Sequence, residues 1–155
     1  AAQNAGEEHG DMLEIRFYDP AAVRDDRLVF AVIITKSGGR WVFCKHKARS
    51  TYEFPGGHHE AGETILETAR RELYEETGAL EYELTQICAY SVAGETNVNR
   101  TGEELFGMLF FADIHTFEPE LHYEIERLLI TDALPQNWTY PDIQPVLMKK
   151  AIESL

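Results

Sequence analysis

Residues Gly56–Gly78 read GGHHEAGETILETARRELYEETG, and this stretch carries the strongest structural and chemical signals in the chain. Its second part, Glu63–Thr77, predicts a helix. Thr64 and Glu67 have the spacing of a capping box, in which each residue satisfies a backbone N–H of the other at the start of a helix. Gly78 is a natural helix end, because glycine adopts the left-handed conformation that closes the last turn.

Three carboxylates lie close together on this predicted helix. At about 100° per residue, the spacing i, i+3, i+4 places Glu72, Glu75 and Glu76 on one face. Like charges packed in this way destabilise an isolated helix, which indicates a cation that neutralises them. A hard, oxygen-binding ion such as Mg²⁺ or Mn²⁺ suits three carboxylates. The alternative interpretation is an ordinary surface helix with scattered charges.

The apolar face of the same helix places these carboxylates at the rim of a cleft. The glutamates overlap one edge of a predicted buried stripe that comprises Ile65, Leu66, Ala69 and Leu73. The predicted solvated side carries Glu67, Arg71 and Tyr74. Ahead of the helix, Pro55-Gly56-Gly57 predicts a tight loop with no regular element. Such a turn leaves a backbone carbonyl free to join a metal shell.

Strand-like segments flank the helix on both sides. The predicted strands are Leu28–Ile34, Arg40–His46, Leu84–Val92 and Leu105–Ile114, with a short β-prone segment at Thr51–Phe54. Turns are predicted at Ser37-Gly38-Gly39, which makes a hairpin of the first two strands, and at Asn97–Gly102. Glu124–Asp132 is ambiguous, although Leu128-Leu129-Ile130 suggests a short strand, and a terminal helix is expected from Pro145 or later to Ile152. This order suggests a mixed sheet flanked by helices.

The motif resembles the signature of the Nudix hydrolase family. That signature is matched by Gly57, Glu63, Arg71-Glu72-Leu73, Glu75-Glu76 and Gly78, and the one soft position is Ala79, where the family usually has a larger aliphatic residue. A gapped pattern with this many fixed positions is specific. The resemblance implies an α/β protein with the Nudix fold, an α/β/α sandwich with a mixed β-sheet.

The resemblance also implies roles for individual residues. The metal ligands would be Glu72, Glu75, Glu76 and the backbone carbonyl of Gly56, with Glu76 the strongest. Glu63 would orient or support the attacking water at the metal. Arg71 would hold the loop–helix–loop together by an ion pair, expected with a glutamate of the same motif.

Several family members use a further glutamate from a later loop as a metal ligand or base. Alignment on Leu134-Pro135 places this residue at Glu124, with Glu126 as the runner-up and Glu120 third. The implied reaction is in-line attack of water on phosphorus, with the metal neutralising the diphosphate and a carboxylate accepting a proton.

The sequence before the motif resembles the MutT-type branch, which includes 8-oxo-dGTP diphosphatases. The segment Tyr52–Gly57, with its Glu-Phe-Pro-Gly-Gly, carries this likeness. Residues that could bind the substrate are Lys45, Lys47, Arg49, Tyr52, Glu53 and Phe54, the basic ones by meeting a triphosphate. His58 and His59 follow the two glycines and are favoured as bystanders over phosphate contacts.

The function expected from this branch is hydrolysis of a nucleoside triphosphate to monophosphate and pyrophosphate with Mg²⁺ or Mn²⁺, and an oxidised purine nucleotide is one candidate substrate. One alternative is a Nudix hydrolase of ADP-ribose, a nucleotide sugar, a dinucleoside polyphosphate or an RNA 5′ end. Another is a non-catalytic nucleotide-binding module with the Nudix fold, which the intact motif disfavours.

Composition limits the remaining possibilities. The 155 residues include 27 acidic side chains against 14 Lys and Arg, a net charge of -13, which disfavours binding of a nucleic-acid polymer. The sequence has no apolar run of 18 residues and no visible signal peptide, so a cytoplasmic location is expected. Cys44 and Cys88 are expected to be free and buried. We expect a flexible or non-native tail over Ala1–Asp11, a natural start at Met12 and one Nudix domain over 12–155, and a homodimer is the candidate assembly.

Overall fold

The computed structural model describes residues 13–94 and 102–155. In chain order its elements are β1 (Glu14–Tyr18), η1 (Pro20–Ala22), η2 (Asp25–Arg27), β2 (Leu28–Ser37), β3 (Arg40–His46), β4 (Gly56–His58), α2 (Ile65–Thr77), β5 (Ala79–Ala93), β6 (Leu105–Phe117), β7 (Ile125–Thr131) and α3 (Gln144–Glu153). The predicted tail, the predicted start at Met12 and most of the predicted turn at Asn97–Gly102 lie outside the described residues.

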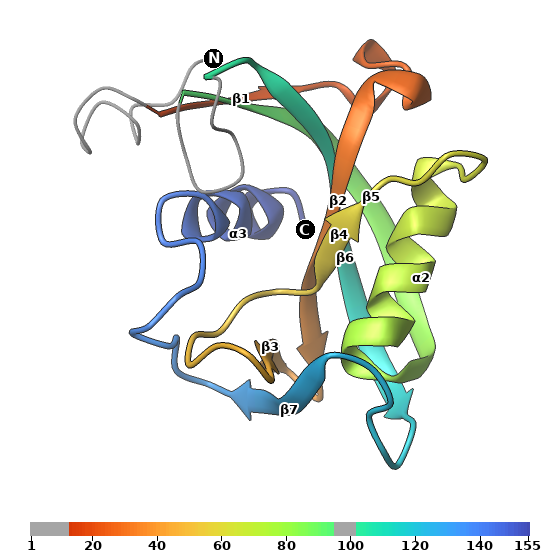
Figure 1. The fold of residues 1–155 in the computed structure, drawn as a ribbon, viewed down its shortest axis with the longest axis vertical. Helices are drawn as coiled ribbons and strands as arrows, with labels where there is room; N and C mark the ends of the chain where they lie inside the picture. Colours follow the sequence, from red (N-terminus) through yellow and green to blue (C-terminus); the bar gives the residue numbers. More distant parts are fainter. Residues whose placement is uncertain (1–12, 95–101) are drawn as a thin grey trace.

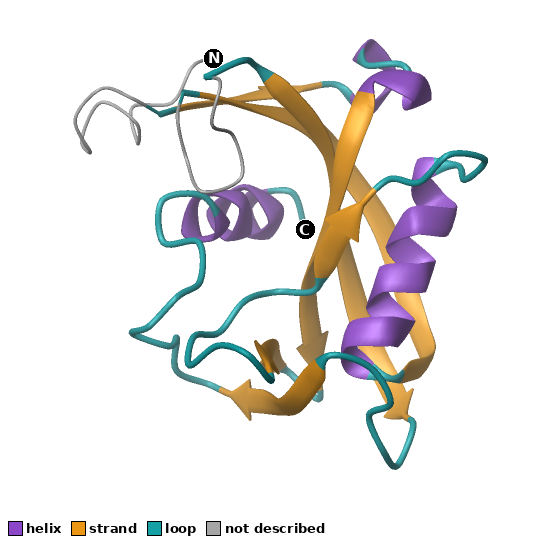
Figure 2. Cartoon of the chain, in the orientation of Figure 1, coloured by secondary structure: helices purple, strands orange, loops and turns teal. Residues whose placement is uncertain are grey.

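One mixed sheet organises the chain. Its strand order is β1-β5-β6-β2-β3-β7, and β4 pairs with β2 beside this path. The pairing of β2 with β6 is parallel, whereas the other strand pairs are antiparallel. Helix α2 covers one face of the sheet and α3 the other (Figure 1; Figure 2 shows the same view by element type). This arrangement confirms the predicted α/β/α sandwich.

Each face of the sheet carries its own apolar core. The core under α2 includes Ala31, Ile33, Ala69, Leu73, Met108 and Phe110, and the core under α3 includes Ile34, Phe43, Phe54, Leu109, Leu147 and Ala151. Strand alternation explains the division, because successive residues of β2 and β6 point to opposite faces. The predicted burial of Leu66 is wrong, since this side chain is 41% exposed. The buried face of α2 turns the other way and includes Thr68, Glu76 and Thr77.

Helix α2 begins and ends as its sequence predicts. The Thr64 hydroxyl accepts a hydrogen bond from the Glu67 backbone N–H at 3.1 Å, and the Glu67 carboxylate accepts one from the Thr64 N–H at 2.9 Å. The capping box is therefore confirmed, and the first helical residue is Ile65 because Thr64 is the cap. Gly78 closes the helix with φ of 74°.

The predicted irregular loop at Pro55-Gly56-Gly57 is wrong for its two glycines. Gly56–His58 forms β4, which pairs antiparallel with the first half of β2 through Val32↔Gly56 and Ala31↔Gly57. A Cβ atom at Gly56 would overlap the backbone carbonyl of Ala31. The glycines thus permit a close strand approach rather than interrupting the strand.

Other element bounds differ more modestly from the predictions. The strand predicted from Leu84 begins at Ala79, because the chain enters β5 directly from the turn at Gly78. The ambiguous segment Glu124–Asp132 contains β7, which pairs with β3. The segment Thr51–Phe54 forms only isolated bridges, at Tyr52 and Glu53.

Two further expectations concern the whole chain. Cys44 and Cys88 are both free and buried, as predicted. Among the described residues, none of the helices is long and apolar enough to cross a membrane.

The capping box yields a stability prediction. Thr64→Ala removes the hydroxyl that accepts from the Glu67 N–H, and the free energy of unfolding should fall by about 1 kcal/mol. Thr64→Ser keeps the acceptor and should stay within about 0.5 kcal/mol of the wild type. Urea unfolding at neutral pH measures both values, and equal stabilities of the two variants would contradict the role of the cap.

Candidate active site

The junction of β4 and α2 leaves no room for side chains at its two glycines. The Gly56 backbone N–H donates to Glu76 Oε1 at 3.0 Å and so orients this buried carboxylate. A Cβ atom at Gly57 would overlap the carboxyl group of Glu72. The absence of side chains therefore lets the strand lie directly against the acidic face of the helix.

Arg71 ties the loop to the helix. Its guanidinium donates to Glu63 at 2.6 and 3.1 Å, to Glu72 at 3.0 Å, to Glu75 at 3.4 Å and to the His58 carbonyl at 3.1 Å. The predicted ion pair with a glutamate of the same motif is thus confirmed. The predicted position of Arg71 on the solvated side is wrong, because the side chain folds back over the loop and is only 24% exposed.

Glu63 is bound by Arg71 and Thr68 and does not line the acidic pocket of the site. Its Oε1 accepts from the Thr68 hydroxyl at 2.7 Å while both oxygens face Arg71. The hydrogen bond from Arg71 holds the pKa of Glu63 at about 2, below its usual value. Its carboxylate is therefore engaged by the protein on both oxygens.

The other acidic residues of the motif line a hollow of about 240 Å³, which we call the acidic hollow. Its walls are Gly56, Gly57, His58, Glu60, Glu72, Glu75, Glu76, Tyr123, Glu124 and Ile125. The structure therefore brings together the expected ligand residues Gly56, Glu72, Glu75, Glu76 and Glu124. Glu63, which was expected to orient or support the attacking water, does not line this hollow.

The electrostatics of the acidic hollow suit a cation. Burial, together with the charge of Glu76, raises the pKa of Glu72 to about 7, and burial raises the pKa of Glu76. Crowded carboxylates that resist ionisation are stabilised when a cation enters among them. The donor set consists of oxygen atoms, as Mg²⁺ and Mn²⁺ prefer.

The three candidates for the additional glutamate, Glu124, Glu126 and Glu120, lie in different surroundings. Glu124 precedes β7 and lines the acidic hollow, as its predicted role requires. Glu126, the runner-up, instead accepts from Lys45 Nζ at 2.7 Å on the exposed side of the strand. Glu120, the third choice, is exposed and does not line the hollow.

A second cavity of about 250 Å³ adjoins the first, and we call it the apolar cavity. Its apolar walls include Phe30, Val32, Phe54, Tyr90, Val92 and Leu105, and its polar ones include His46, Arg49, Glu53, Tyr140 and Gln144. The two cavities share Gly56, Gly57, His58 and Glu76 as a common wall.

Only half of the expected substrate residues face this cavity. Arg49, Glu53 and Phe54 line it. Lys45 is held by Glu126 instead, and Tyr52 accepts a hydrogen bond from Arg127 at 2.8 Å. Lys47 is exposed and lines neither cavity. Lys45 belongs to β3 itself and pairs with Glu126 of β7, whereas Lys47 and Tyr52 follow the strand.

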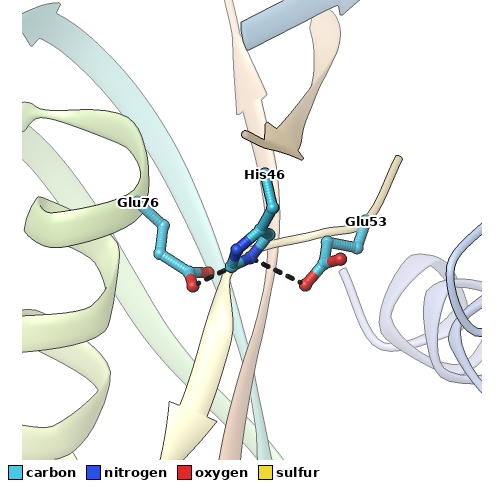
Figure 3. Close-up of side chains that lie close together, drawn as sticks. All are labelled: His46, Glu53 and Glu76. Atoms are coloured by element: carbon cyan, nitrogen blue, oxygen red, sulfur yellow. Dashed lines mark ion pairs between the residues drawn. The ribbon is translucent and has the colours of Figure 1, made fainter. Parts of the chain in front are cut away.

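His46 is a site residue that the sequence analysis missed. Its Nε2 lies 3.3 Å from Glu53 Oε2 and 3.5 Å from Glu76 Oε2 (Figure 3). These two carboxylates raise the pKa of His46 to about 10. Strand alternation was the available signal, because Cys44 and His46 lie on one face of β3 and both contact Glu76.

His59 stabilises the loop between β4 and α2. Its ring nitrogens lie 2.9 Å from the Leu28 carbonyl and 2.6 Å from the Glu63 carbonyl. Burial alone would lower the pKa of His59, but the two carbonyls and nearby Asp25 raise it. This histidine therefore has a structural role, because its ring bridges two backbone carbonyls and holds the loop ahead of α2 in place.

The Arg71–Glu63 pair predicts acid sensitivity. The pKa of Glu63 is lowered from 4.5 to about 2 by folding, so its contribution to stability is complete above pH 4.5 and is lost as the pH falls toward 2. In Glu63→Gln, stability should therefore decline less steeply with acid over this range. Urea unfolding at several pH values measures the slope, and an unchanged slope in the variant would contradict the assignment.

Comparison with known proteins agrees with this geometry. Residues 25–142 match the NUDIX domain family model. YtkD of Bacillus subtilis (strain 168), a proposed 8-oxo-dGTP diphosphatase, is 33% identical over 132 residues, which cover 79% of each chain. The crystal structure of the Bacillus subtilis pyrophosphohydrolase BsRppH is similar with a TM-score of 0.73 at 27% identity over 92% of each chain. That of a MutT NUDIX hydrolase from Burkholderia pseudomallei has a TM-score of 0.59 at 20% identity, over 79% of this chain and 96% of the other. The chain therefore belongs to the Nudix family of hydrolases, which act on acid anhydrides.

Proposed function

We propose that this enzyme hydrolyses a nucleoside triphosphate to the monophosphate and pyrophosphate with Mg²⁺ or Mn²⁺. The observation that carries the proposal is the wall shared by the acidic hollow and the apolar cavity, formed by Gly56, Gly57, His58 and Glu76. A nucleotide laid across this wall has its phosphates among oxygen ligands and its base among apolar side chains. The charged phosphates and the apolar base of such a substrate would then each lie in the cavity whose chemistry suits them.

The residues of the acidic hollow would hold the metal and the water. Nudix hydrolases use divalent metals, and here Glu72, Glu75, Glu76, Glu124 and the Gly56 carbonyl are the proposed ligands. A bound divalent ion neutralises the diphosphate and polarises phosphorus. Glu124 lines the hollow from the segment before β7, where it can accept the proton of the attacking water. Arg71 and Glu63 contribute by keeping the helix carboxylates in place.

The apolar cavity would receive the nucleobase. Phe30 and Tyr90 offer aromatic surface, while Glu53 and Arg49 bring hydrogen-bonding groups to its edge. The 33% identical relative YtkD supports a triphosphate substrate, and an oxidised purine nucleotide is one candidate. The pyrophosphohydrolase BsRppH supports cleavage that releases pyrophosphate.

The substrate is tested by pyrophosphate and phosphate release from a nucleotide panel. The panel contains the four common dNTPs, 8-oxo-dGTP, ADP-ribose, a diadenosine polyphosphate and a 5′-triphosphorylated RNA, each with and without Mg²⁺. Metal-dependent pyrophosphate release from a mononucleotide is expected. Turnover of only ADP-ribose, the dinucleotide or RNA would keep the family and site but overturn the substrate class. Metal binding without any turnover would favour the non-catalytic alternative.

Glu76→Gln should lower kcat on the best panel substrate by about 100-fold or more, because it removes a charged ligand without changing side-chain volume. Glu126→Gln is the matched control. Its carboxylate pairs with Lys45 outside the acidic hollow, so activity should remain within about twofold of the wild type. Near-normal turnover by a folded Glu76→Gln variant would contradict the site.

A further inference from the structure

A buried nitrogen of a residue that lines the apolar cavity has no hydrogen bond. His46 Nε2 is fully buried and, among the described residues, is the one such side-chain atom without a hydrogen-bond partner. A buried polar atom without a partner is costly, so its position calls for an explanation. Glu53 and Glu76 flank it, but neither carboxylate oxygen meets it in hydrogen-bond geometry.

Each flanking carboxylate has one oxygen held by the protein and one that faces His46. Glu53 Oε1 accepts from Arg49 at 2.7 Å, while its Oε2 lies toward the imidazole. Glu76 Oε1 accepts from the Gly56 N–H at 3.0 Å, while its Oε2 also lies toward the imidazole. Partners that orient the far side of a ligand are a regular feature of metal sites. Figure 3 shows the three side chains converging from β3, the segment before β4, and α2.

The spacing of the three facing atoms fits coordination better than direct pairing. The distances from Nε2 are 3.3 and 3.5 Å, and one ligand atom from each residue can be chosen so that all three lie within 4.8 Å of one another. Two atoms that each bind one ion at ~2.1 Å lie about 3.4 Å apart at the tetrahedral angle. A charge-assisted hydrogen bond would instead bring nitrogen and oxygen to ~2.8 Å.

We propose that His46 Nε2, Glu53 Oε2 and Glu76 Oε2 form a second cation site, which takes a borderline divalent ion such as Mn²⁺, Co²⁺ or Zn²⁺. One imidazole and two carboxylates favour these ions over Mg²⁺, which prefers oxygen ligands alone. A divalent ion would displace the proton of His46, and the neutral imidazole with two carboxylates then carries the two negative charges that balance the ion. Three protein ligands leave a fourth position open toward the apolar cavity, which all three residues line.

This inference rests on the proposed function in one respect, because Glu76 would be a ligand of both ions. The second ion would lie on the base-binding side of Glu76 and the first on the phosphate side, since Glu76 lines both cavities. It would make the acidic hollow and the apolar cavity one continuous two-ion site.

The test measures metal binding without any nucleotide. Metal-free protein is titrated with Co²⁺ alone, and bound ions per chain are counted by equilibrium dialysis while the visible spectrum reports the coordination. Imidazole-bound, four-coordinate Co²⁺ absorbs far more strongly than Co²⁺ surrounded by six oxygen atoms. Wild type should bind one more Co²⁺ than His46→Gln and should show a visible band that this variant loses. Glu53→Gln should show the same loss.

His122→Gln is the matched control, because this histidine is exposed and lines neither cavity. It should bind as many ions as wild type and keep the band. Thermal unfolding and near-ultraviolet circular dichroism identify any variant that fails to fold, and Glu53→Gln provides the second opportunity if His46→Gln does fail. An unchanged ion count and spectrum in folded His46→Gln and Glu53→Gln would overturn the inference. His46 would then be a protonated side chain that pairs with two carboxylates and binds no metal.

Turnover separates this inference from the proposed function. Pyrophosphate release by wild type with Mg²⁺ alone tests the proposed function and does not depend on the second site. If release occurs but the ion count does not change in His46→Gln, the second site is wrong and the function stands. If the count changes but no nucleotide is cleaved, the proposed function is wrong and the second site stands.

Discussion

The guanidinium of Arg71 joins three carboxylates and one backbone carbonyl, and the shape of the site depends on these bonds. Glu72 and Glu75 belong to the same turn of α2 and repel each other, while Glu63 belongs to the loop ahead of it. One planar cation with several donors can satisfy all of them at once, whereas the single ammonium of a lysine could not. These ion pairs hold the loop and the helix together, and they keep Glu72 and Glu75 close to each other at the acidic hollow.

The second constraint is steric, because the strand that faces the helix has no side chains where the two meet. Gly56 fits against the backbone of Ala31 on one side, and its N–H reaches Glu76 on the other. Gly57 leaves the space that the Glu72 carboxyl occupies. Any larger residue would move the carboxylates away from the hollow. Arg71 and the two glycines therefore act on the same group of acids from opposite sides.

Much of this local structure could be predicted because it depends on residues close in sequence. The capping box, the end of α2 at Gly78 and the clustering of the three glutamates follow from spacing along one helix. Alignment of the later loop on Leu134-Pro135, which rested on the family resemblance, added Glu124, and this residue lines the acidic hollow.

The missed features depend on contacts between distant segments. The pairing of Gly56–His58 with β2 was hidden by the usual preference of glycine for turns, which tertiary packing overrides here. His46 joins the site because the end of β3 contacts the end of α2, where Cys44 and His46 both contact Glu76. Lys45, its neighbour, points to the other face of the strand and pairs with Glu126. Of the basic residues predicted to bind the substrate, Arg49 lines the apolar cavity and Lys45 and Lys47 do not.

The most direct test of the site is a crystal structure with Mn²⁺ and a non-hydrolysable nucleoside triphosphate analogue. Anomalous scattering from Mn²⁺ should appear in the acidic hollow, within bonding distance of Glu76 and of the analogue's phosphates. The base should occupy the apolar cavity on the far side of the wall formed by Gly56, Gly57, His58 and Glu76. Mn²⁺ and phosphates bound elsewhere, with the acidic hollow empty, would contradict the assignment of this hollow as the catalytic centre.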